Sequence, residues 1–481
     1  MPGILRFGGA LAATLVLLAP AIWNRFPLLQ YDTGGYLARW YEGYLVPSRS
    51  TVYGLFLMLL SWADFWPVVI VQSLLTVWVL ALTLRALGFG GRPWLLLGVT
   101  ASLCAFTTLP WLTSILLTDI FAALPVLAIY LLVFGDDALR RAERLALVAL
   151  IAFAVATHSA TFAVLLALVL AAALAHGLFR LGTHRRSKNG VPSIDHSRSK
   201  NGVASLAYGG IVRGGVALAL GAFLLLSANY VTSGRFVWTP GGVALSFGRM
   251  LQDGIVARYL DEHCPDKRLR LCAHRHEIPD DADVFFWSGD GSVFNRLGRF
   301  AGLGDEMALI AGESLRAYPA WQLQAAAVAT LRQLVHVASG EGVVSTAWHT
   351  VGMVEKFTPH AAPGMFASRL QRGELDFTAI NTIHKPVALA AMLLLVPLMV
   401  WGARRQSMTG LGRLAGTAAC ALFANAVVCG VFANPHDRYG ARLVWLAPLV
   451  VGLAAVRLYE QSRSDPAEAL QSGAIPGSTL P

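Results

Sequence analysis

Residues 65–87 read FWPVVIVQSLLTVWVLALTLRAL and decide the fold class. The stretch contains a single charged residue, Arg85, and an apolar run of about 20 residues is long enough to cross the ~30 Å hydrocarbon core of a bilayer. Similar runs recur along the 481-residue chain, which is 56% hydrophobic and only 14% charged. Ordinary soluble domains carry about 25% charged residues. The sequence therefore predicts an all-α polytopic membrane protein.

Apolar periodicity and run length together predict about ten transmembrane helices. They are expected at Ile4–Trp23, Phe65–Leu87, Trp94–Leu109, Ser114–Phe134, Leu145–Thr157, Ala160–Phe179, Ile211–Val231, Pro386–Ala403, Leu411–Phe432 and Leu443–Tyr459. The piece Val52–Trp62 is too short to cross and predicts an interfacial or re-entrant helix. No clear small-residue cleavage site follows the first run, so we expect a retained signal anchor, with cleavage near Ala21 as the alternative.

The distribution of Lys and Arg predicts the orientation, because short cytoplasmic loops are enriched in both. With the N-terminus cytoplasmic, 18 of the 24 basic residues outside Thr232–His384 fall on the cytoplasmic side. The segment Thr232–His384 has 14 Lys and Arg against 16 Asp and Glu, so the net charge of +10 is not a basic patch for nucleic acid. We expect a multi-pass protein of a bacterial inner (plasma) membrane, with both termini cytoplasmic.

Composition divides the chain into five parts. They are an N-terminal transmembrane bundle (1–231), a basic disordered cytoplasmic loop within it (180–213), a small, mainly α extracytoplasmic domain (232–384), the last three spans (385–460) and a cytoplasmic tail (461–481). The basic loop repeats the sequence RSKNGV at Arg186 and Arg198. The repeat is interpreted as a tolerated duplication, or alternatively as a binding patch for anionic lipid.

Two features of the extracytoplasmic domain stand out. A helix is predicted from Ala317 past Leu334, either lying along the membrane face or forming a core helix of the domain. Cys264 and Cys272 have seven residues between them and are expected to form a disulfide in an oxidising compartment. The neighbouring histidines at 263, 274 and 276 suggest zinc as an alternative, although their spacing matches no common zinc motif.

Ionisable residues beside apolar runs are functional candidates, because burying them in a membrane protein is costly. Asp32, in the stretch Asp32-Thr-Gly-Gly-Tyr36, and Asp119, in Leu117-Thr-Asp119, are both expected at the extracytoplasmic surface. Two such carboxylates act as a general base and an orienting partner, or share a divalent cation. The alternative for each is a simple helix N-cap.

Arginines on the same side go against the charge rule. They are Arg49, Arg438 and Arg442. Guanidinium groups bind phosphate oxygens in bidentate fashion, which suggests the phosphate of a lipid carrier. The alternatives are contact with lipid headgroups or a salt bridge with Asp437. His158, at the turn before the sixth span, reaches the same cavity or is simply a turn histidine.

Several other chemistries lack their sequence signatures. The chain has no phosphate loop, no HExxH helix, no GxGxxG after a strand and no GxSxG elbow. An enzyme of this kind would have to take its donor from the membrane and not from nucleotides.

The first 180 residues resemble the GT-C superfamily of integral-membrane glycosyltransferases, which includes protein O-mannosyltransferases and aminoarabinose transferases. The resemblance rests on Asp32-Thr-Gly-Gly-Tyr36, Arg49-Ser-Thr-Val-Tyr53, Val71-Gln-Ser-Leu-Leu75 and Leu117-Thr-Asp119, with weaker similarity at Ala317-Tyr-Pro319 and Arg438-Tyr439. The chain departs from the family pattern at Thr33, where many members carry a second acid, and at Ser50-Thr51, where prolines are common.

The resemblance implies an inverting transfer of a sugar from a polyprenyl-phosphate-linked donor to a hydroxyl of a glycan, lipid or protein acceptor. Asp32 would be the catalytic base, and Asp119 would orient the acceptor or help to hold a divalent cation, if the reaction uses one; the resemblance implies no other cofactor. Tyr36, Tyr53 and Tyr439 would join the arginines and His158 in binding substrate. Membrane lipids are the expected partners besides the substrates, and nucleic acid is not one.

Three rival functions stay open. An O-antigen ligase or polymerase also pairs an outer loop with arginines. A flippase or transporter of a lipid-linked glycan would use the same arginines without chemistry, but it would carry polar residues through the bundle and repeated halves. A purely structural assembly partner would be indifferent to the replacement of Asp32.

Overall fold

A computed structural model describes residues 2–42, 49–188, 197–239, 242–289 and 291–471. These residues form helices joined by loops, with an isolated β-bridge between Leu28 and Ile115. All ten predicted apolar runs are largely helical, although the long helix of the run Ser114–Phe134 begins only at Ile120, and six helices of the described residues are long and apolar enough to cross a membrane. Three shorter apolar helices, Ile4–Leu17, Pro93–Phe106 and Ile120–Phe134, accompany them. The all-α membrane class therefore holds, and the ten crossings stay a prediction.

The first half of the chain builds most of the bundle. Its helices are α1 (Pro2–Leu17), α2 (Ala19–Asn24), α3 (Thr33–Glu42), α4 (Thr51–Leu59), η1 (Ser61–Ala63), α5 (Trp66–Ala86), α6 (Pro93–Phe106), α7 (Leu109–Ser114), α8 (Ile120–Phe134), η2 (Asp136–Ala138), α9 (Arg141–Thr157), α10 (Ser159–Lys188) and α11 (Ser197–Ser233). Helix α8 is buried from Ile120 to Val133 and forms the centre of the bundle. The predicted short helix at Val52–Trp62 corresponds to α4 and η1.

Helices α10 and α11 extend into the segment 180–213, for which the sequence predicts a disordered loop. Helix α10 continues to Lys188 and α11 begins at Ser197, while residues 189–196 lie outside the described part of the chain. The helices therefore reach beyond the apolar runs that predict them. Part of the RSKNGV repeat falls on these undescribed residues, so its role is not addressed.

The second half adds a domain and closes the bundle. Its helices are α12 (Gly242–Gln252), α13 (Ile255–His263), η3 (Arg270–His274), α14 (Ala282–Trp287), α15 (Val293–Arg296), α16 (Arg299–Ala317), α17 (Pro319–Val335), α18 (Trp348–Phe357), η4 (Pro359–Ala361), α19 (Ala362–Phe366), α20 (Thr378–Arg404), η5 (Gln406–Met408), α21 (Thr409–Phe432), α22 (Asp437–Val444) and α23 (Leu446–Gln471).

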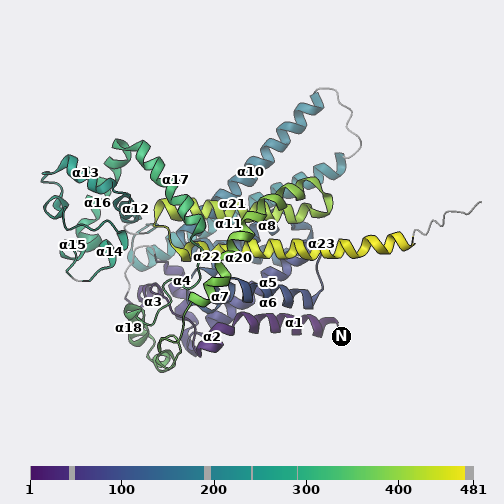
Figure 1. The fold of residues 1–481 in the computed structure, drawn as a ribbon, viewed down its shortest axis with the longest axis horizontal. Coiled ribbons are helices and arrows are strands. Elements are labelled where there is room, and N and C mark those ends of the chain that lie inside the picture. The colour runs from purple at the N-terminus through teal and green to yellow at the C-terminus, as the bar shows by residue number, and fades with distance from the viewer. Residues whose placement is uncertain (1, 43–48, 189–196, 240–241, 290, 472–481) are drawn as a thin grey trace, which may run out of the picture.

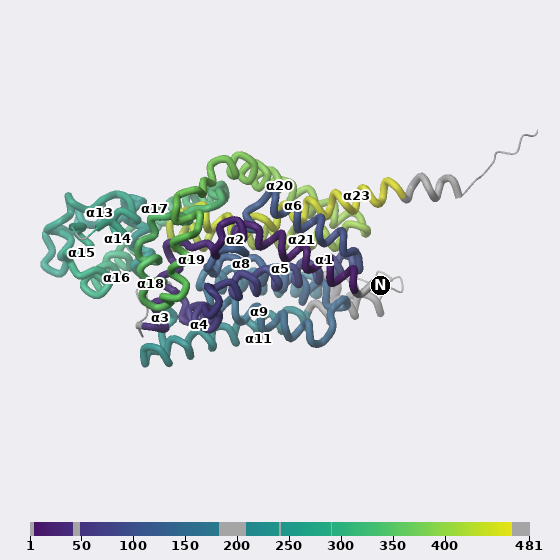
Figure 2. The backbone as a smooth tube through the Cα atoms, turned by 90° about the horizontal axis from the view of Figure 1, so that it is seen from below, coloured from purple at the N-terminus to yellow at the C-terminus, as the bar shows by residue number. Residues whose placement is uncertain are grey.

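The molecule is elongated, and its two ends differ. Helices α12–α16 (residues 242–317, the helical domain) stand at one end of the bundle, whereas α1 begins at the other end and α23 runs toward it (Figures 1 and 2). We call these the domain end and the terminal end. At the terminal end Asp136, which is only 4% exposed, accepts hydrogen bonds from Arg144 and Arg213, each at 2.7 Å.

The predicted domain 232–384 divides between two hydrophobic cores. Residues Ala244–Ala311, together with Ala325, form a core of their own, but Val337, Val343, Val354 and Leu370 belong to the core of the bundle. The segment after α17 therefore covers the domain end of the bundle and is not part of the helical domain. The apolar residues of this segment lie in short stretches without a sustained period, so the sequence pattern did not separate the segment from the helical domain.

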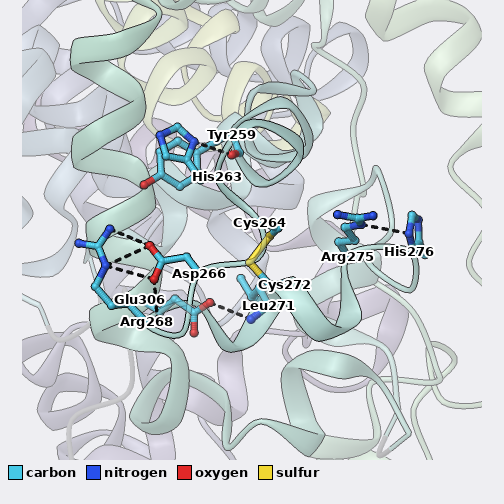
Figure 3. Close-up of a disulfide and its surroundings, with 10 residues drawn as sticks. All are labelled: Tyr259, His263, Cys264, Asp266, Arg268, Leu271, Cys272, Arg275, His276 and Glu306. Atoms are coloured by element: carbon cyan, nitrogen blue, oxygen red, sulfur yellow. Dashed lines mark hydrogen bonds and ion pairs between the residues drawn. A yellow bond between two sulfur atoms is a disulfide. The ribbon is translucent and has the colours of Figure 1, made fainter.

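A disulfide joins Cys264 and Cys272 in the helical domain, with an S–S distance of 2.04 Å (Figure 3). Nearby, His263 stacks on the Tyr259 ring, and His276 accepts a hydrogen bond from Arg275 Nε at 3.0 Å. No group of three or more His, Cys, Asp or Glu side chains suited to a metal gathers anywhere in the described residues. The zinc alternative therefore finds no ligand set in this region.

Candidate functional site

Asp32 lies in a tightly held loop directly before α3. Gln30 Oε1 accepts a hydrogen bond from the Asp32 backbone N–H at 2.7 Å. Thr350 Oγ1, from α18, accepts from Gly34 N–H and donates to Gln30 O, both at 2.9 Å. A Cβ at Gly34 would stand 2.7 Å from Thr350 Cα, so only glycine permits this approach. No motif in the sequence marks Thr350 as part of the site.

The carboxylate of Asp32 is held by two guanidinium groups. Arg438 Nη1 donates to Oδ2 at 2.7 Å, and Arg49 Nη2 donates to Oδ1. Burial by itself would raise the pKa of Asp32, but Arg49 and Arg438 outweigh it and lower the pKa to about 2. A residue that merely caps a helix would not need two arginines, so these ion pairs favour a functional interpretation of Asp32.

Arg49 and Arg438 are far apart in the sequence, and the local structure around each of them brings both to Asp32. Arg49 precedes α4, whose first turn is capped by Ser50 Oγ accepting from Tyr53 N–H at 3.2 Å. Arg438 is in the first turn of α22, and its guanidinium lies over the Tyr439 ring at 5.1 Å. Arginine and aromatic faces attract one another in this geometry.

Arg442 is the most deeply buried cation of the site, with 1% of its surface exposed. Its guanidinium donates to Asn425 Oδ1 at 2.7 Å and to Cys429 Sγ at 3.1 Å, and it lies 3.5 Å from His158 Nε2. These described partners are all neutral, and no carboxylate of the described residues forms an ion pair with Arg442. The alternative of a salt bridge with Asp437 finds no such ion pair among the described residues, and Asp437 Oδ1 accepts from Ala338 N–H at 2.8 Å.

Asp119 occupies the N-cap position of α8, but its side chain makes no capping hydrogen bond. It is 4% exposed and lines a cavity together with Arg438, Glu341 and Gln30. The helix-cap alternative for Asp119 is therefore wrong. The two candidate carboxylates, Asp32 and Asp119, are linked through Arg438, which pairs with the first and lines the cavity of the second.

The remaining predicted residues fall into two groups. Tyr36, His158 and Tyr439 lie beside the arginines: Arg49 is 5.9 Å from the Tyr36 ring centre, and Arg442 is 5.6 Å from that of Tyr439. Burial first, and then the nearby Arg442, lowers the pKa of His158 well below its usual value.

Tyr53 instead lies in the core. It is fully buried and donates to Gln72 Oε1 at 3.2 Å, and its ring packs edge-on against Tyr36 at 5.1 Å. Gln72 in turn donates to Thr113 O and Ile115 O, which fixes the connection leading to Asp119. Tyr53 therefore supports Tyr36 and the loops of the site but makes no described contact with Asp32 or Asp119.

Sequence reasoning missed Glu341 and His436. Glu341 accepts from His436 Nδ1 at 2.6 Å and from Arg438 N–H at 2.7 Å, while His436 Nε2 lies 3.3 Å from Asp283 of the helical domain. Burial alone would lower the pKa of His436, but Glu341 and Asp283 raise it. A lone Glu between two glycines carries no recognisable motif, so only the fold identifies it.

No family model, curated protein or solved structure matches this chain. The chemistry of the site is therefore argued from its own residues.

Proposed function

We propose that this protein is a membrane glycosyltransferase of the GT-C type. It would move a sugar from a polyprenyl-phosphate donor to an acceptor hydroxyl at the domain end of the bundle. The observation that carries the proposal is the pairing of Asp32 with Arg49 and Arg438, beside the buried Arg442. A carboxylate among guanidinium groups supplies both a proton acceptor and a site for phosphate.

The buried Arg442 supports the binding of an anion. A buried charge without a counter-ion is costly, because the desolvation of the ion is not offset. Asp119 attracts Arg442 electrostatically without a direct ion pair, and a phosphate that displaces Asn425 or His158 from the guanidinium would provide that pair. The phosphate of a polyprenyl carrier reaches such a site from the membrane, which fits a chain without nucleotide-binding motifs.

The transfer follows from these roles. Asp32 takes the proton of the acceptor hydroxyl, whose oxygen attacks the anomeric carbon from the face opposite the phosphate. The bond from that carbon to the phosphate oxygen breaks, polyprenyl phosphate leaves with the electron pair, and the configuration inverts. With a pKa of about 2, Asp32 is a weak base while both arginines hold it. Donor phosphate that draws Arg49 away would raise this pKa and make Asp32 a stronger base.

The cellular setting belongs to the same proposal. We place the protein in a bacterial inner membrane, with the helical domain on the periplasmic side and both termini in the cytoplasm. The disulfide of the helical domain supports this placement, since such bonds persist in oxidising compartments.

The test is turnover of undecaprenyl-phosphate sugars by the protein in nanodiscs, with and without a chelator. Asp32→Asn should lower turnover by about 100-fold or more, as expected when a general base is removed. Asp305→Asn, the same change at an exposed carboxylate of α16, is the control and should match wild type. Equal turnover by Asp32→Asn and wild type would refute the proposed role of Asp32, and a loss with chelator would establish a cation.

A lipid-linked glycan flippase or transporter is the second candidate. The low pKa of Asp32 favours it, because a carboxylate held by two arginines abstracts protons poorly, whereas the arginines can still bind the lipid phosphate. Binding of the lipid phosphate without turnover of any donor would support this function. An O-antigen ligase or polymerase would instead require an oligosaccharide donor, so transfer from single-sugar carriers would argue against it.

A further inference from the structure

A cavity of about 30 Å³ is lined by Arg438, the partner of Asp32, and lies between the loop before α3, the α7–α8 connection, the segment 337–343 and α22. Its polar lining residues include Gln30, Asp119, Ser339, Glu341 and Arg438. Because a water molecule needs roughly 10–15 Å³ of such space, the cavity has room for about two. It is therefore the size of two neighbouring hydroxyl groups.

Asp119 is the unsatisfied acceptor of this cavity. Its side chain is 4% exposed, and within the described residues it has neither a hydrogen bond nor an ion pair. Burying a carboxylate without donors is costly, so native structures supply partners for such groups. Arg438 and Arg442 attract Asp119 electrostatically, and a molecule that enters the cavity would supply it with direct hydrogen-bond donors.

The other polar groups of the cavity are largely occupied. Both Glu341 oxygens accept hydrogen bonds, from His436 and from Arg438 N–H. Ser339 Oγ lies 2.8 Å from His384 Nδ1. Arg438 Nε, in contrast, is buried and has no partner among the described residues. The cavity therefore offers a ligand one carboxylate acceptor and one guanidinium donor.

A sugar hydroxyl fits this pair better than a metal ion does. A hydroxyl both donates and accepts, whereas a divalent cation needs several oxygen ligands, and Asp119 is the carboxylate of the lining that is not already bonded. The wall includes Trp111 and Phe377, whose rings are 4.7 Å apart. Sites for small molecules combine such apolar walls with a few placed polar groups.

We propose that this cavity is the subsite for a hydroxyl-bearing edge of a sugar, with Asp119 accepting from its hydroxyls and Arg438 donating to them. The inference rests on the proposed function in taking the sugar to be that of the donor or of the acceptor. Since Arg438 also pairs with Asp32, the subsite places the sugar next to the base.

Binding tests the subsite without requiring turnover. The probes are undecaprenyl phosphate and its mannosyl and glucosyl derivatives, titrated against the protein in nanodiscs. Wild type should bind at least one glycosylated lipid 10-fold or more tightly than the bare lipid. Asp119→Asn should abolish most of this preference while binding the bare lipid within about 2-fold of wild type. Asp305→Asn, the matched control, should keep the preference.

A second variant covers the case in which Asp119→Asn folds poorly. Val343, which is 8% exposed, lines the cavity, and Val343→Phe should fill it and remove the preference with Asp119 intact. Equal binding of all three lipids by wild type, or a preference that survives both variants, would overturn the proposal. A preference that chelator removes would show a cation site instead.

Rate measurements show whether the donor or the acceptor occupies the subsite, and they test the subsite independently of the proposed function. If the sugar of the donor occupies the subsite, Asp119→Asn should slow both transfer and the hydrolysis of the donor in the absence of acceptor. If the sugar of the acceptor occupies the subsite, Asp119→Asn should slow transfer alone. An Asp119-dependent preference without turnover would retain the subsite and reject the transferase. If turnover depends on Asp32 but is unchanged in Asp119→Asn, the transferase would be retained and the subsite rejected.

Discussion

At the residue scale, the pairing of Asp32 with two arginines sets the pH dependence of the proposed reaction. Arg49 and Arg438 lower the pKa of Asp32 to about 2, so the carboxylate of the free protein stays charged until the pH falls to that value. Arg49→Gln removes one of the two cations, and the pKa rises. The acid limb of kcat/KM, which reports the base of the free enzyme, should therefore move to higher pH.

The measurement is the pH at which kcat/KM falls on the acid side, and not the maximum value of kcat/KM, because Arg49→Gln also weakens binding of the donor. Arg316→Gln, a change at an exposed arginine of α16, should leave the limb unmoved. An identical limb in Arg49→Gln and wild type would mean that Asp32 does not titrate in catalysis.

Arg442 makes a second prediction at this scale. It is buried with neutral described partners, and replacing a poorly compensated buried charge with an apolar residue is often neutral or stabilising. Arg442→Met should leave the melting temperature unchanged or raised, yet weaken binding of undecaprenyl phosphate by about 10-fold or more, the loss of one charge-assisted contact. Arg249→Met is the comparison, since Arg249 pairs with Asp253 at 2.6 Å and its loss leaves a carboxylate behind.

The melting temperature of Arg249→Met should therefore fall clearly below that of Arg442→Met. A large fall in Arg442→Met as well would show that Arg442 is structural, and unchanged lipid binding would remove it from the phosphate site.

The residues themselves could largely be picked from the sequence, but their pairing could not. Asp32, Asp119 and the arginines were identifiable because charges beside apolar runs are costly. That Arg438 would reach Asp32, or that Glu341 would hold His436, depends on which helices pack together. No local pattern carries that information.

At the scale of elements, α17 turns its large apolar residues away from the protein. The sequence left two alternatives for this helix, lying along the membrane face or forming a core helix of the domain. In the structure Ala325 and Ala329 are buried, whereas Leu323 and Leu331 are exposed. Membrane helices commonly pack through small residues and turn large ones to lipid. Helix α17 therefore packs on the bundle as a membrane-associated helix does.

Gly430 of α21 makes this packing testable. A Cβ at Gly430 would stand 2.8 Å from Ala329 O, so Gly430→Leu should force α17 away from the bundle. Overpacking costs about 1–3 kcal/mol, which should lower the melting temperature by several degrees and expose α17 to protease. Gly416→Leu on the same helix, where the nearest atom is 3.8 Å away, is the control. Equal stability of the two variants would contradict the close packing.

At the scale of the whole molecule, two segments join the helical domain to the candidate site. Helix α17 leads from the domain to the bundle (Figure 1), and His436 bridges Asp283 of the domain and Glu341 of the segment 337–343. The same segment holds the loop before α3, since Gly342 O accepts from Tyr31 N–H at 3.2 Å. These contacts connect the helical domain, through the segment 337–343, to the loop that carries Asp32.

The two ends of the molecule also predict its orientation. Helix α1 begins at the terminal end, and α23 runs toward that end, opposite the helical domain (Figures 1 and 2). Buried Asp136 and its arginines mark the terminal end, and the Cys264–Cys272 disulfide marks the domain. Basic residues stay on the cytoplasmic side, and disulfides persist on the oxidising side. We therefore expect the domain outside the cytoplasm and the termini within it.

Matched cysteines test this orientation. Asp305→Cys places a thiol on exposed α16 of the helical domain, and Asp137→Cys places one at an exposed position next to Asp136. A charged, membrane-impermeant maleimide added to whole cells should label Asp305→Cys directly but Asp137→Cys only after permeabilisation. The reverse pattern would put Asp32 and its arginines on the cytoplasmic side. The proposed donor would then have to face the cytoplasm, and the assignment of the site to a periplasmic transferase would fall with the orientation.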